Sequence, residues 1–529
     1  MKKSIVALSA IAAMSMSAFG AKLTHNDLQA QIEALKAQLS ALESKINEQK
    51  IVTAQPAADT EKRLAKIEKK LNKNSKKINK VKAHDAGDNI KWNVDFRTSV
   101  DNLTYKHASG KESENDALMT NRLWLGMKFK ADENSSFYGT LSYLKAFGDT
   151  ANHSQSNTNP GYADFDWLTN ENALDNTLNV KEAYWLYTND SFLGNNDISW
   201  TASVGRRPST DGLGINFSAD QQRKSPLSHT VNVEFDGASA RFNLDKVTGV
   251  EGMWFKFCAG RGLTNAKPRF QNDGADYAND DSKNPDIDMA GFIFVPYDNG
   301  QYSVHMNYAR AWNLIGFSGS AIQGYQAAYG AYAAAPSATT AYNLSAATPA
   351  FNDVGDMDLA TVMFKAEGLG NGISDFLDNT TVFASYAMSK TRPNSVGMLG
   401  TTDSKQGDSF WLGINMPDGF TDDGRFGIEW NKGSKYWRSM TYGEDTMAGS
   451  KIATRGTAWE VYYHKSLTKA LSASLSYTQI DYDYTGSNSF FGAEGTPNDL
   501  SLINGTNAAL YGDPVKEATN IMGYIRYRY

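Results

Sequence analysis

The stretch "NRLWLGMKFKADENSSFYGTLSYLKAFGD", residues 121–149, alternates apolar and polar side chains on both sides of a short polar turn. Leu123 and Leu125 fall on one face of an extended chain, whereas Arg122 and Lys128 fall on the other. Successive side chains of a strand point to opposite faces of a sheet, and "ADENSS" has the composition of a turn. The stretch therefore predicts a β-hairpin with one apolar face and one charged face.

The same two-residue period recurs through most of the chain after residue 86. It is present in residues 89–101, 121–130, 135–146, 196–208, 250–262, 300–312, 357–368, 379–390, 425–433, 457–466, 471–484 and 521–529. We expect about 16 to 18 strands of roughly 9 to 13 residues, which is long for soluble sheets and suited to strands tilted across a bilayer. Aromatic residues make up 12% of the chain although its mean hydropathy is -0.48, a combination that such alternation produces.

The N-terminal stretch "MKKSIVALSAIAAMSMSAFGA" has the pattern of a secretory signal peptide. Lys2 and Lys3 precede a short apolar run, and Ala18 and Gly20 have the small-residue spacing of a cleavage site, which predicts a signal peptide over residues 1–20 and an exported chain. After residue 21 no run approaches the 18 or so apolar residues of a transmembrane helix. Cys258 is the only cysteine, which excludes a disulfide framework, a cysteine zinc cluster and a lipid anchor at the new N-terminus.

Residues 21–85 show a seven-residue period and predict a periplasmic coiled coil in two blocks, separated near Pro56. The core positions of the seam are Leu28, Ile32, Leu35, Leu39, Leu42 and Ile46, then Leu64, Ile67, Leu71, Asn74, Ile78 and Val81. Asn74 at a core position would set the register of the helices at a cost in stability. The core residues leave the oligomeric state undecided, with a trimer as the favoured homo-oligomer. The two blocks could instead fold back as a helical hairpin within one chain, because Pro56 interrupts the helix.

The second block of the coiled coil is basic. Residues 61–82 hold ten lysines and arginines against Glu61 and Glu68, although the whole chain has a net charge of -6. Such a helix could contact anionic groups of the cell wall, and peptidoglycan is therefore an expected partner; the simpler interpretation is a solvated helix face. Nucleic acid is excluded as a partner of an exported chain.

Residues 86–529 are predicted to form a transmembrane β-barrel, so the fold class is mainly β with an α-helical coiled coil before it. Alternation alone also suits a soluble sandwich or propeller, in which the apolar face would point inward. The signal peptide, the aromatic residues at strand ends and the closing strand "IMGYIRYRY", residues 521–529, favour the barrel. In lipid no sheet edge is tolerated, so the last strand should pair with the first.

Two long loops are expected between strands. Residues 318–353 are rich in Ala, Tyr and Ser, and are predicted to form a loop that is either external or folded into the lumen. Residues 271–288 carry six aspartates, whose spacing is not that of an EF-hand, so a solvated acidic loop is expected in preference to a Ca²⁺ site.

Several stretches resemble a known class of proteins. The alternating Ile521, Ile525, Tyr527 and Tyr529 resemble the C-terminal signature by which the barrel assembly machinery recognises bacterial outer-membrane barrels. The succession of signal, coiled coil and barrel is similar to porin-like outer-membrane proteins. The hairpin at 121–149, "VGRRPSTDGLG" at 204–214 and residues 235–262 resemble an uncharacterised porin-like family of the epsilon-proteobacteria. The resemblance implies an outer-membrane barrel in contact with lipid and lipopolysaccharide, and it names no solute; the basic coiled coil departs from simple porins.

The inward-facing residues of such a barrel can be predicted, because they alternate along each strand with the apolar residues that face lipid. The predicted pore-lining residues are Arg97, Arg122, Lys128, Arg207, Arg241, Lys256, Lys365, Arg425, Glu429, Glu460 and Arg526. Because rings of Arg or Lys favour anions, this excess of cations suggests a preference for small anionic solutes, whereas arginines that merely pair with carboxylates would confer none. A slip of one residue in register would reassign a whole strand.

The sequence predicts neither a catalytic site nor a bound cofactor or metal. The seven histidines are scattered, and the chain contains no HExxH and no G-x-S-x-G motif. The favoured function is passive diffusion of small hydrophilic solutes across the outer membrane of a Gram-negative bacterium. The alternative is a structural anchor, in which a sealed barrel tethers the membrane to the cell wall through the basic coiled coil.

Overall fold

The computed structural model describes residues 90–148, 178–207, 209–263, 286–349, 351–370, 372–441, 446–487 and 495–529, together with a few positions between 29 and 70. The chain divides into two compact units, Met1–Asn89 and Ile90–Tyr529. In the first unit, residues 32–34 and 36–41 are helical and include Ile32 and Leu39 of the predicted seam. The remaining seam residues, Pro56 and the expected signal peptide lie outside the described residues.

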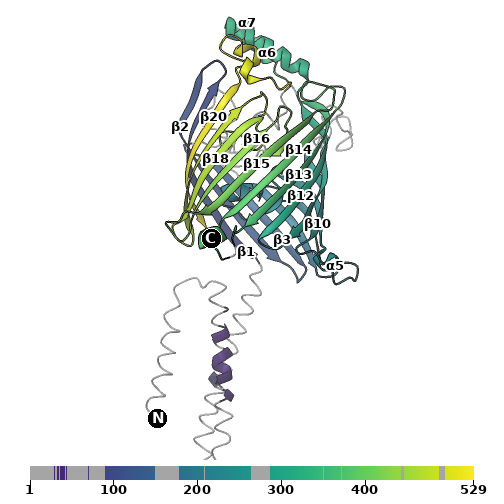
Figure 1. Ribbon diagram of the computed structural model, residues 1–529, viewed down its shortest axis with the longest axis vertical. Coiled ribbons are helices and arrows are strands. Elements are labelled where there is room, and N and C mark those ends of the chain that lie inside the picture. Colours follow the sequence, from purple (N-terminus) through teal and green to yellow (C-terminus); the bar gives the residue numbers. More distant parts are fainter. Residues whose placement is uncertain are drawn as a thin grey trace, which may run out of the picture. The chain divides into compact units, whose positions relative to one another are not determined.

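The second unit is a closed antiparallel β-barrel of 16 strands, as the alternation predicted (Figure 1). Its strands, in order around the ring, are β1 (Ile90–His107), β2 (Glu112–Lys130), β3 (Ser135–Ala146), β4 (Asn179–Asn189), β5 (Trp200–Arg207), β9 (Phe235–Asn243), β10 (Trp254–Leu263), β11 (Ile287–Asp298), β12 (Tyr302–Gly316), β13 (Asn352–Glu367), β14 (Thr381–Pro393), β15 (Gln406–Pro417), β16 (Gly424–Gly433), β18 (Gly456–Ser466), β19 (Leu471–Tyr482) and β20 (Val515–Arg528).

The barrel closes where β20 pairs with β1. Tyr527 lies opposite Phe96, and beyond the strand Val94 and Tyr529 exchange backbone hydrogen bonds of 2.8 and 2.9 Å. The predicted pairing of the last strand with the first is therefore confirmed. In a closed ring, the backbone N–H and C=O groups of every strand form hydrogen bonds with the two neighbouring strands. A bilayer requires this because its core contains no water to bond these groups.

The strands place apolar side chains on the outer face and polar ones on the inner face. On β1, Phe96 and Val100 are exposed, whereas the alternate residues Arg97, Ser99 and Asp101 are buried. Burial inside and exposure outside is the arrangement expected of a barrel with an apolar exterior. The residues proposed as an assembly signature, Ile521, Ile525, Tyr527 and Tyr529, are all exposed.

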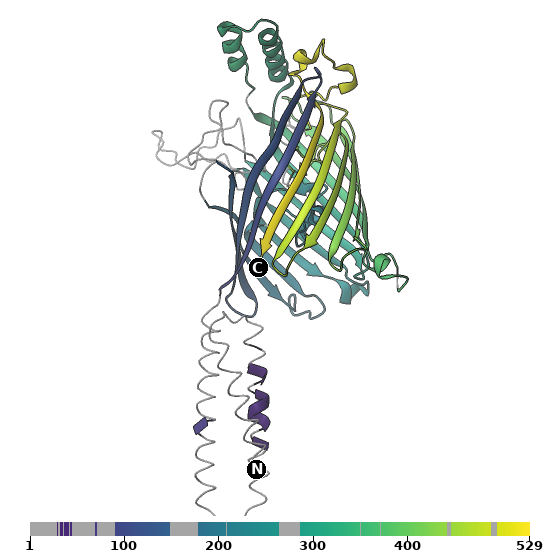
Figure 2. The same ribbon diagram turned by 90° about the vertical axis from the view of Figure 1, so that its left-hand side faces the viewer.

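Residues 318–349 do not enter the barrel. They form α6 (Gly319–Ala334) and α7 (Ala338–Ala346), which lie beyond the strands at the end of the barrel opposite the C-terminus (Figures 1 and 2). Ser318 and Ser337 cap the two helices through bonds to the backbone N–H groups of Ala321 and Thr340. Helix α6 packs against η4 (Ala508–Tyr511). The described residues of this stretch are therefore not folded into the lumen.

Among the described residues, no helix is both long enough and apolar enough to cross a membrane.

Candidate functional site

Two connections between strands fold into the barrel. We call residues 209–234, between β5 and β9, the first inward segment, and residues 434–455, between β16 and β18, the second inward segment; residues 442–445 of the second are not described. The first holds the short strands β6 (Gly212–Leu213), β7 (Lys224–Leu227) and β8 (Val231–Asn232) and the helical turn α4 (Ile215–Ser218); the second holds β17 (Met440–Thr441). Strand β17 pairs in parallel with β8, so the two segments form one internal structure.

The first inward segment bonds to strands around the ring, which places it inside the barrel. His229 lies between Ser385 of β14 and Ser409 of β15, with nitrogen to oxygen distances of 2.7 and 2.9 Å. The hydroxyls of Thr230 and Thr361, the latter on β13, are 2.7 Å apart. On the other side of the ring, the ammonium of Lys181 on β4 donates to Glu234 at 3.1 Å, and Lys224 forms an ion pair with Glu182.

The second inward segment is held by a buried charge. The Lys451 ammonium, fully enclosed between the segments and the wall, donates to Glu429 of β16 at 2.7 Å and pairs with Glu460 of β18. Trp411 of β15 also donates to Glu429, at 3.0 Å. Two of the predicted pore-lining residues, Glu429 and Glu460, thus bind a lysine of the inward segment, where a single removed partner would leave a buried charge uncompensated.

The C-terminal strand anchors the first inward segment. The Arg526 guanidinium forms an ion pair with Asp95 of β1 and donates to the carbonyls of Ala219 and Asp220 at 3.2 and 3.1 Å. Arg528 donates to the side chain of Asp220 at 2.8 Å. The cationic face of "IMGYIRYRY" therefore points inward and holds the internal structure in place.

The inward segments cover the inner face of strands β13–β18. Inner-face side chains of β13, β15 and β18, such as Met363, Trp411 and Tyr462, are 0–1% exposed. On the wall formed by β2–β5, β9 and β10, some inner-face residues keep part of their surface accessible: Lys128 is exposed, and Tyr138 and Tyr184 are half-buried. Accessible side chains of the inner face thus include residues of this second wall.

The accessible charge along this wall is basic. Arg207, Arg241 and Lys256 are half-buried, and Arg223 of the first inward segment is exposed even though it contacts the buried ring of His305 at 3.2 Å. Several of these cations lie over aromatic rings: Lys128 is 5.0 Å from the ring centre of Tyr138, Arg207 is 5.8 Å from that of Tyr184 and Arg241 is 4.2 Å from that of Trp254. Aromatic faces stabilise cations and hold them at defined positions.

Five carboxylates inside the barrel are, in contrast, buried in ion pairs. Asp95, Glu182, Glu234, Glu429 and Glu460 are each no more than 8% exposed, and each pairs with an internal lysine or arginine. Their charge is therefore largely neutralised within the wall.

The other predicted pore-lining residues also have inner-face positions. Arg97 and Arg122 are buried, and Arg122 lies 3.7 Å from the ring centre of Trp124. Lys365 is buried and pairs with Glu367 at 2.7 Å. Arg425 donates to the side chain and backbone oxygens of Asn415. Whether any of these residues contacts a passing solute stays a prediction.

The sequence did not reveal the inward segments. They contain no periodic pattern, and their glycines and polar residues have the composition of ordinary loops between strands. One local sign exists: Gly214 has φ of +107°, and a Cβ there would lie 2.2 Å from the ring of Trp411. Such a glycine marks close packing, yet a single sequence does not show what it packs against.

No metal centre is evident in the described part of the chain, which holds no group of three or more His, Cys, Asp or Glu side chains placed to bind one. Asp286 and Asp288, the described residues of the expected acidic loop, both pair with Arg261. His305 and His464 lie on the inner face, where they contact Ser303 and Ser474 at 2.8 Å.

A closed barrel of 16 antiparallel strands with an apolar exterior and a polar interior defines a transmembrane β-barrel protein. Residues 112–529 match the family model described as "Protein of unknown function (DUF3373)", and the chain belongs to this family.

Solved structures with similar folds include outer-membrane proteins. OmpT, an outer membrane protein of Vibrio cholerae, is 11% identical with a TM-score of 0.40, over 83% of this chain and 99% of that chain. OprB of Pseudomonas putida is 11% identical with a TM-score of 0.43, over 83% and 94%. OmpF of Salmonella typhi, in complex with daunomycin, is 10% identical with a TM-score of 0.42, over 84% and 99%. No curated protein matches the sequence.

Proposed function

We propose that this protein is an outer-membrane channel for passive diffusion of small hydrophilic solutes and that it favours anions. The observation that carries the proposal is the distribution of charge inside the barrel. Lys128, Arg207, Arg241 and Lys256 on β2–β10 are at least partly accessible, whereas five internal carboxylates are buried in ion pairs. Exposed Arg and Lys in a pore attract anions and repel cations.

The size of the barrel supports a channel. Barrels of 16 or more strands are wide enough to leave an aqueous lumen unless loops fill it. Here the two inward segments cover the inner face of β13–β18, and we infer that a narrower path remains past the partly accessible residues of β2–β10. Such a path suits small solutes, and its cations are spread along the wall from Lys128 to Lys256.

The outer membrane is the proposed location. The apolar exterior of the barrel fits a bilayer, and the N-terminal sequence pattern is that of an exported chain. The external helices α6 and α7 would then face the outside of the cell, because the C-terminal end of an outer-membrane barrel and its short turns face the periplasm.

Planar-bilayer recordings of the mature full chain test the channel. We expect stable single-channel conductance and, in a KCl gradient, a reversal potential shifted toward the chloride equilibrium potential. Lys128→Gln and Arg241→Gln should each reduce that shift, because each removes an accessible cation. Lys246→Gln serves as the matched control, since Lys246 is exposed on the turn between β9 and β10, outside the lumen.

Two outcomes would overturn the proposal. A reversal potential on the potassium side in the wild type would refute the anion preference. Absence of conductance, in protein whose heat-modifiable gel mobility shows a folded barrel, would refute the channel itself.

A further inference from the structure

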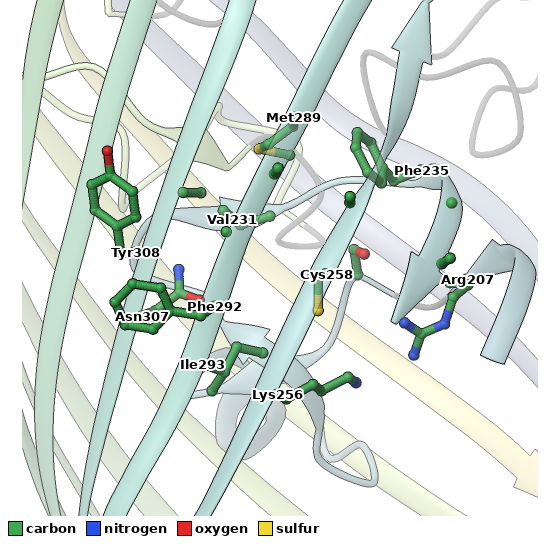
Figure 3. A pocket seen from close by; sticks show the side chains of 17 residues that line it. Arg207, Val231, Phe235, Lys256, Cys258, Met289, Phe292, Ile293, Asn307 and Tyr308 are labelled. Carbon is green, nitrogen blue, oxygen red and sulfur yellow. The ribbon is translucent and has the colours of Figure 1, made fainter. Parts of the chain in front are cut away.

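The barrel interior contains a pocket between the first inward segment and the wall formed by β9–β12 (Figure 3). Val231 and Phe235 face it from the inward segment and the start of β9, and Met289 and Ile293 face it from β11. Lys256 and Arg207 lie at one end, with Cys258 beside them on β10. The pocket is thus apolar over most of its surface and carries two cations at one end.

Glycines shape the wall of this pocket. Gly237 lies opposite Gly260, and Gly291 lies opposite Cys258, on three neighbouring strands. A Cβ on Gly237 would lie 2.2 Å from the carbonyl oxygen of Ala259, and one on Gly291 would lie 2.0 Å from that of Tyr308. The strands therefore approach one another here more closely than side chains at these positions would allow.

The charged end includes Arg207, which has a buried donor atom without an acceptor among the described residues. None of the 17 described residues that line the pocket is Asp or Glu. The guanidinium of Arg207 lies over the ring of Tyr184, and its Nε is buried without a hydrogen-bond partner among the described residues. A buried donor without an acceptor carries a cost in free energy, which a bound anion would remove.

We propose that this pocket binds a small amphiphilic carboxylate, with the carboxylate at Arg207 and Lys256 and the hydrocarbon part against Val231, Phe235 and Met289. An arginine can bind a carboxylate through two parallel hydrogen bonds, and the apolar wall gains free energy by covering hydrocarbon surface. A hydrophilic anion would bind only at the charged end, and a neutral hydrocarbon would contact only the apolar wall. The site rests on the proposed function in one respect, which is that solutes reach the interior of the barrel.

Cys258 provides a local test because it lines the pocket, is half-buried and is the only cysteine of the chain. In the folded full chain, its thiolate attacks a methanethiosulfonate reagent, forms a mixed disulfide and releases methanesulfinate. The rate of this modification is measured by mass spectrometry with the anionic sulfonatoethyl reagent, in the presence of hexanoate, hexanol or acetate. We expect hexanoate to slow the modification severalfold, and hexanol and acetate at the same concentration to have little effect.

Charge variants identify the groups that bind. Arg207→Gln and Lys256→Gln should each raise the hexanoate concentration needed for protection about tenfold, the loss expected for one charge-assisted hydrogen bond. Lys246→Gln, which removes a cation from the turn after β9, should leave protection unchanged. Heat-modifiable gel mobility confirms that each variant is folded, and the comparison of the three compounds on the wild type needs no variant.

Several results would overturn the inference. Equal protection by hexanol would show a merely apolar void, and equal protection by acetate would show general electrostatic attraction. A Cys258 that does not react in the folded barrel would show that water and solutes do not reach the pocket.

Conductance measured on the same preparations separates this inference from the proposed function. Protection by hexanoate without conductance would retain the binding site and reject the channel. Anion-selective conductance without protection would retain the channel and reject the binding site.

Discussion

At the scale of single residues, Gly214 controls how closely the first inward segment approaches the wall. Gly214 has a φ of +107°, and a Cβ added there would lie 2.2 Å from the Trp411 ring. We therefore expect Gly214→Ala to force the segment away from β15. We expect a loss of about 1–3 kcal/mol in the free energy of unfolding, measured in urea. Gly300→Ala is the control: its φ is +86° but nothing lies within 4 Å of the added Cβ, so only backbone strain of about 1 kcal/mol is expected. Equal losses in both variants would contradict the close contact.

Asp418, in the turn between β15 and β16, predicts a dependence of stability on acid pH. Its carboxylate accepts hydrogen bonds from the hydroxyl of Thr421 at 2.7 Å, from the backbone of Thr421 and Phe420, both at 2.9 Å, and from the hydroxyl of Tyr463 at 2.7 Å. These bonds hold its pKa well below the ordinary value of 3.8. A lowered pKa in the folded state stabilises the barrel above the unfolded pKa, and this stabilisation disappears as the pH falls through the folded pKa.

The test compares wild type with Asp418→Asn by the temperature at which the folded band of the barrel is lost on gels. The wild type should lose stability below about pH 4, whereas the variant should be less stable at neutral pH and should change less on acidification. An identical acid dependence in the two proteins would rule out Asp418 as its source.

At the scale of elements, β20 both closes the barrel and anchors the first inward segment. Arg526→Gln should leave Asp95 buried without its ion pair and release the carbonyls of Ala219 and Asp220. We expect a loss of about 3–5 kcal/mol in the free energy of unfolding and a larger, noisier single-channel conductance. Arg528→Gln removes a half-exposed cation two residues further on and should cost no more than about 1 kcal/mol. An unchanged conductance in Arg526→Gln would contradict its role as an anchor.

Some strands do not alternate apolar and polar residues, because the barrel interior next to them is filled by protein. β11 reads "IDMAGFIFVPYD", with Phe292 and Phe294 on one face and Met289, Ile293 and Val295 on the other. Both faces are apolar since the inner one packs against the inward segment or against Trp254. The alternation that predicts a barrel strand depends on a polar lumen, so it fades where protein fills the lumen. In β15, the inward Trp411 has the same effect.

At the scale of the whole molecule, the orientation of the barrel in a bilayer predicts where charge is tolerated. Leu412 lies near the middle of β15 on the outer face and is 46% exposed. Leu412→Arg should destabilise the barrel folded into lipid vesicles by about 2–4 kcal/mol, because the guanidinium would face hydrocarbon. Leu502→Arg, on the short helix η3 (Leu500–Leu502), is the matched control and should be nearly neutral. Equal small effects at both positions would indicate a barrel that faces water.

The sequence by itself determined the fold class, the closing of β20 onto β1 and the parity of the inner face, because these follow from a period of two that each strand carries locally. The tertiary structure decided which inward charges are neutralised and which stay accessible. Glu429 and Glu460 meet Lys451, and Arg526 meets Asp95 and the first inward segment, through pairings that join residues distant along the chain. No local pattern encodes such contacts, since loops without periodicity can cross a barrel in many ways. Only the packing of residues such as His229 against Trp411 of the wall selects one of these ways.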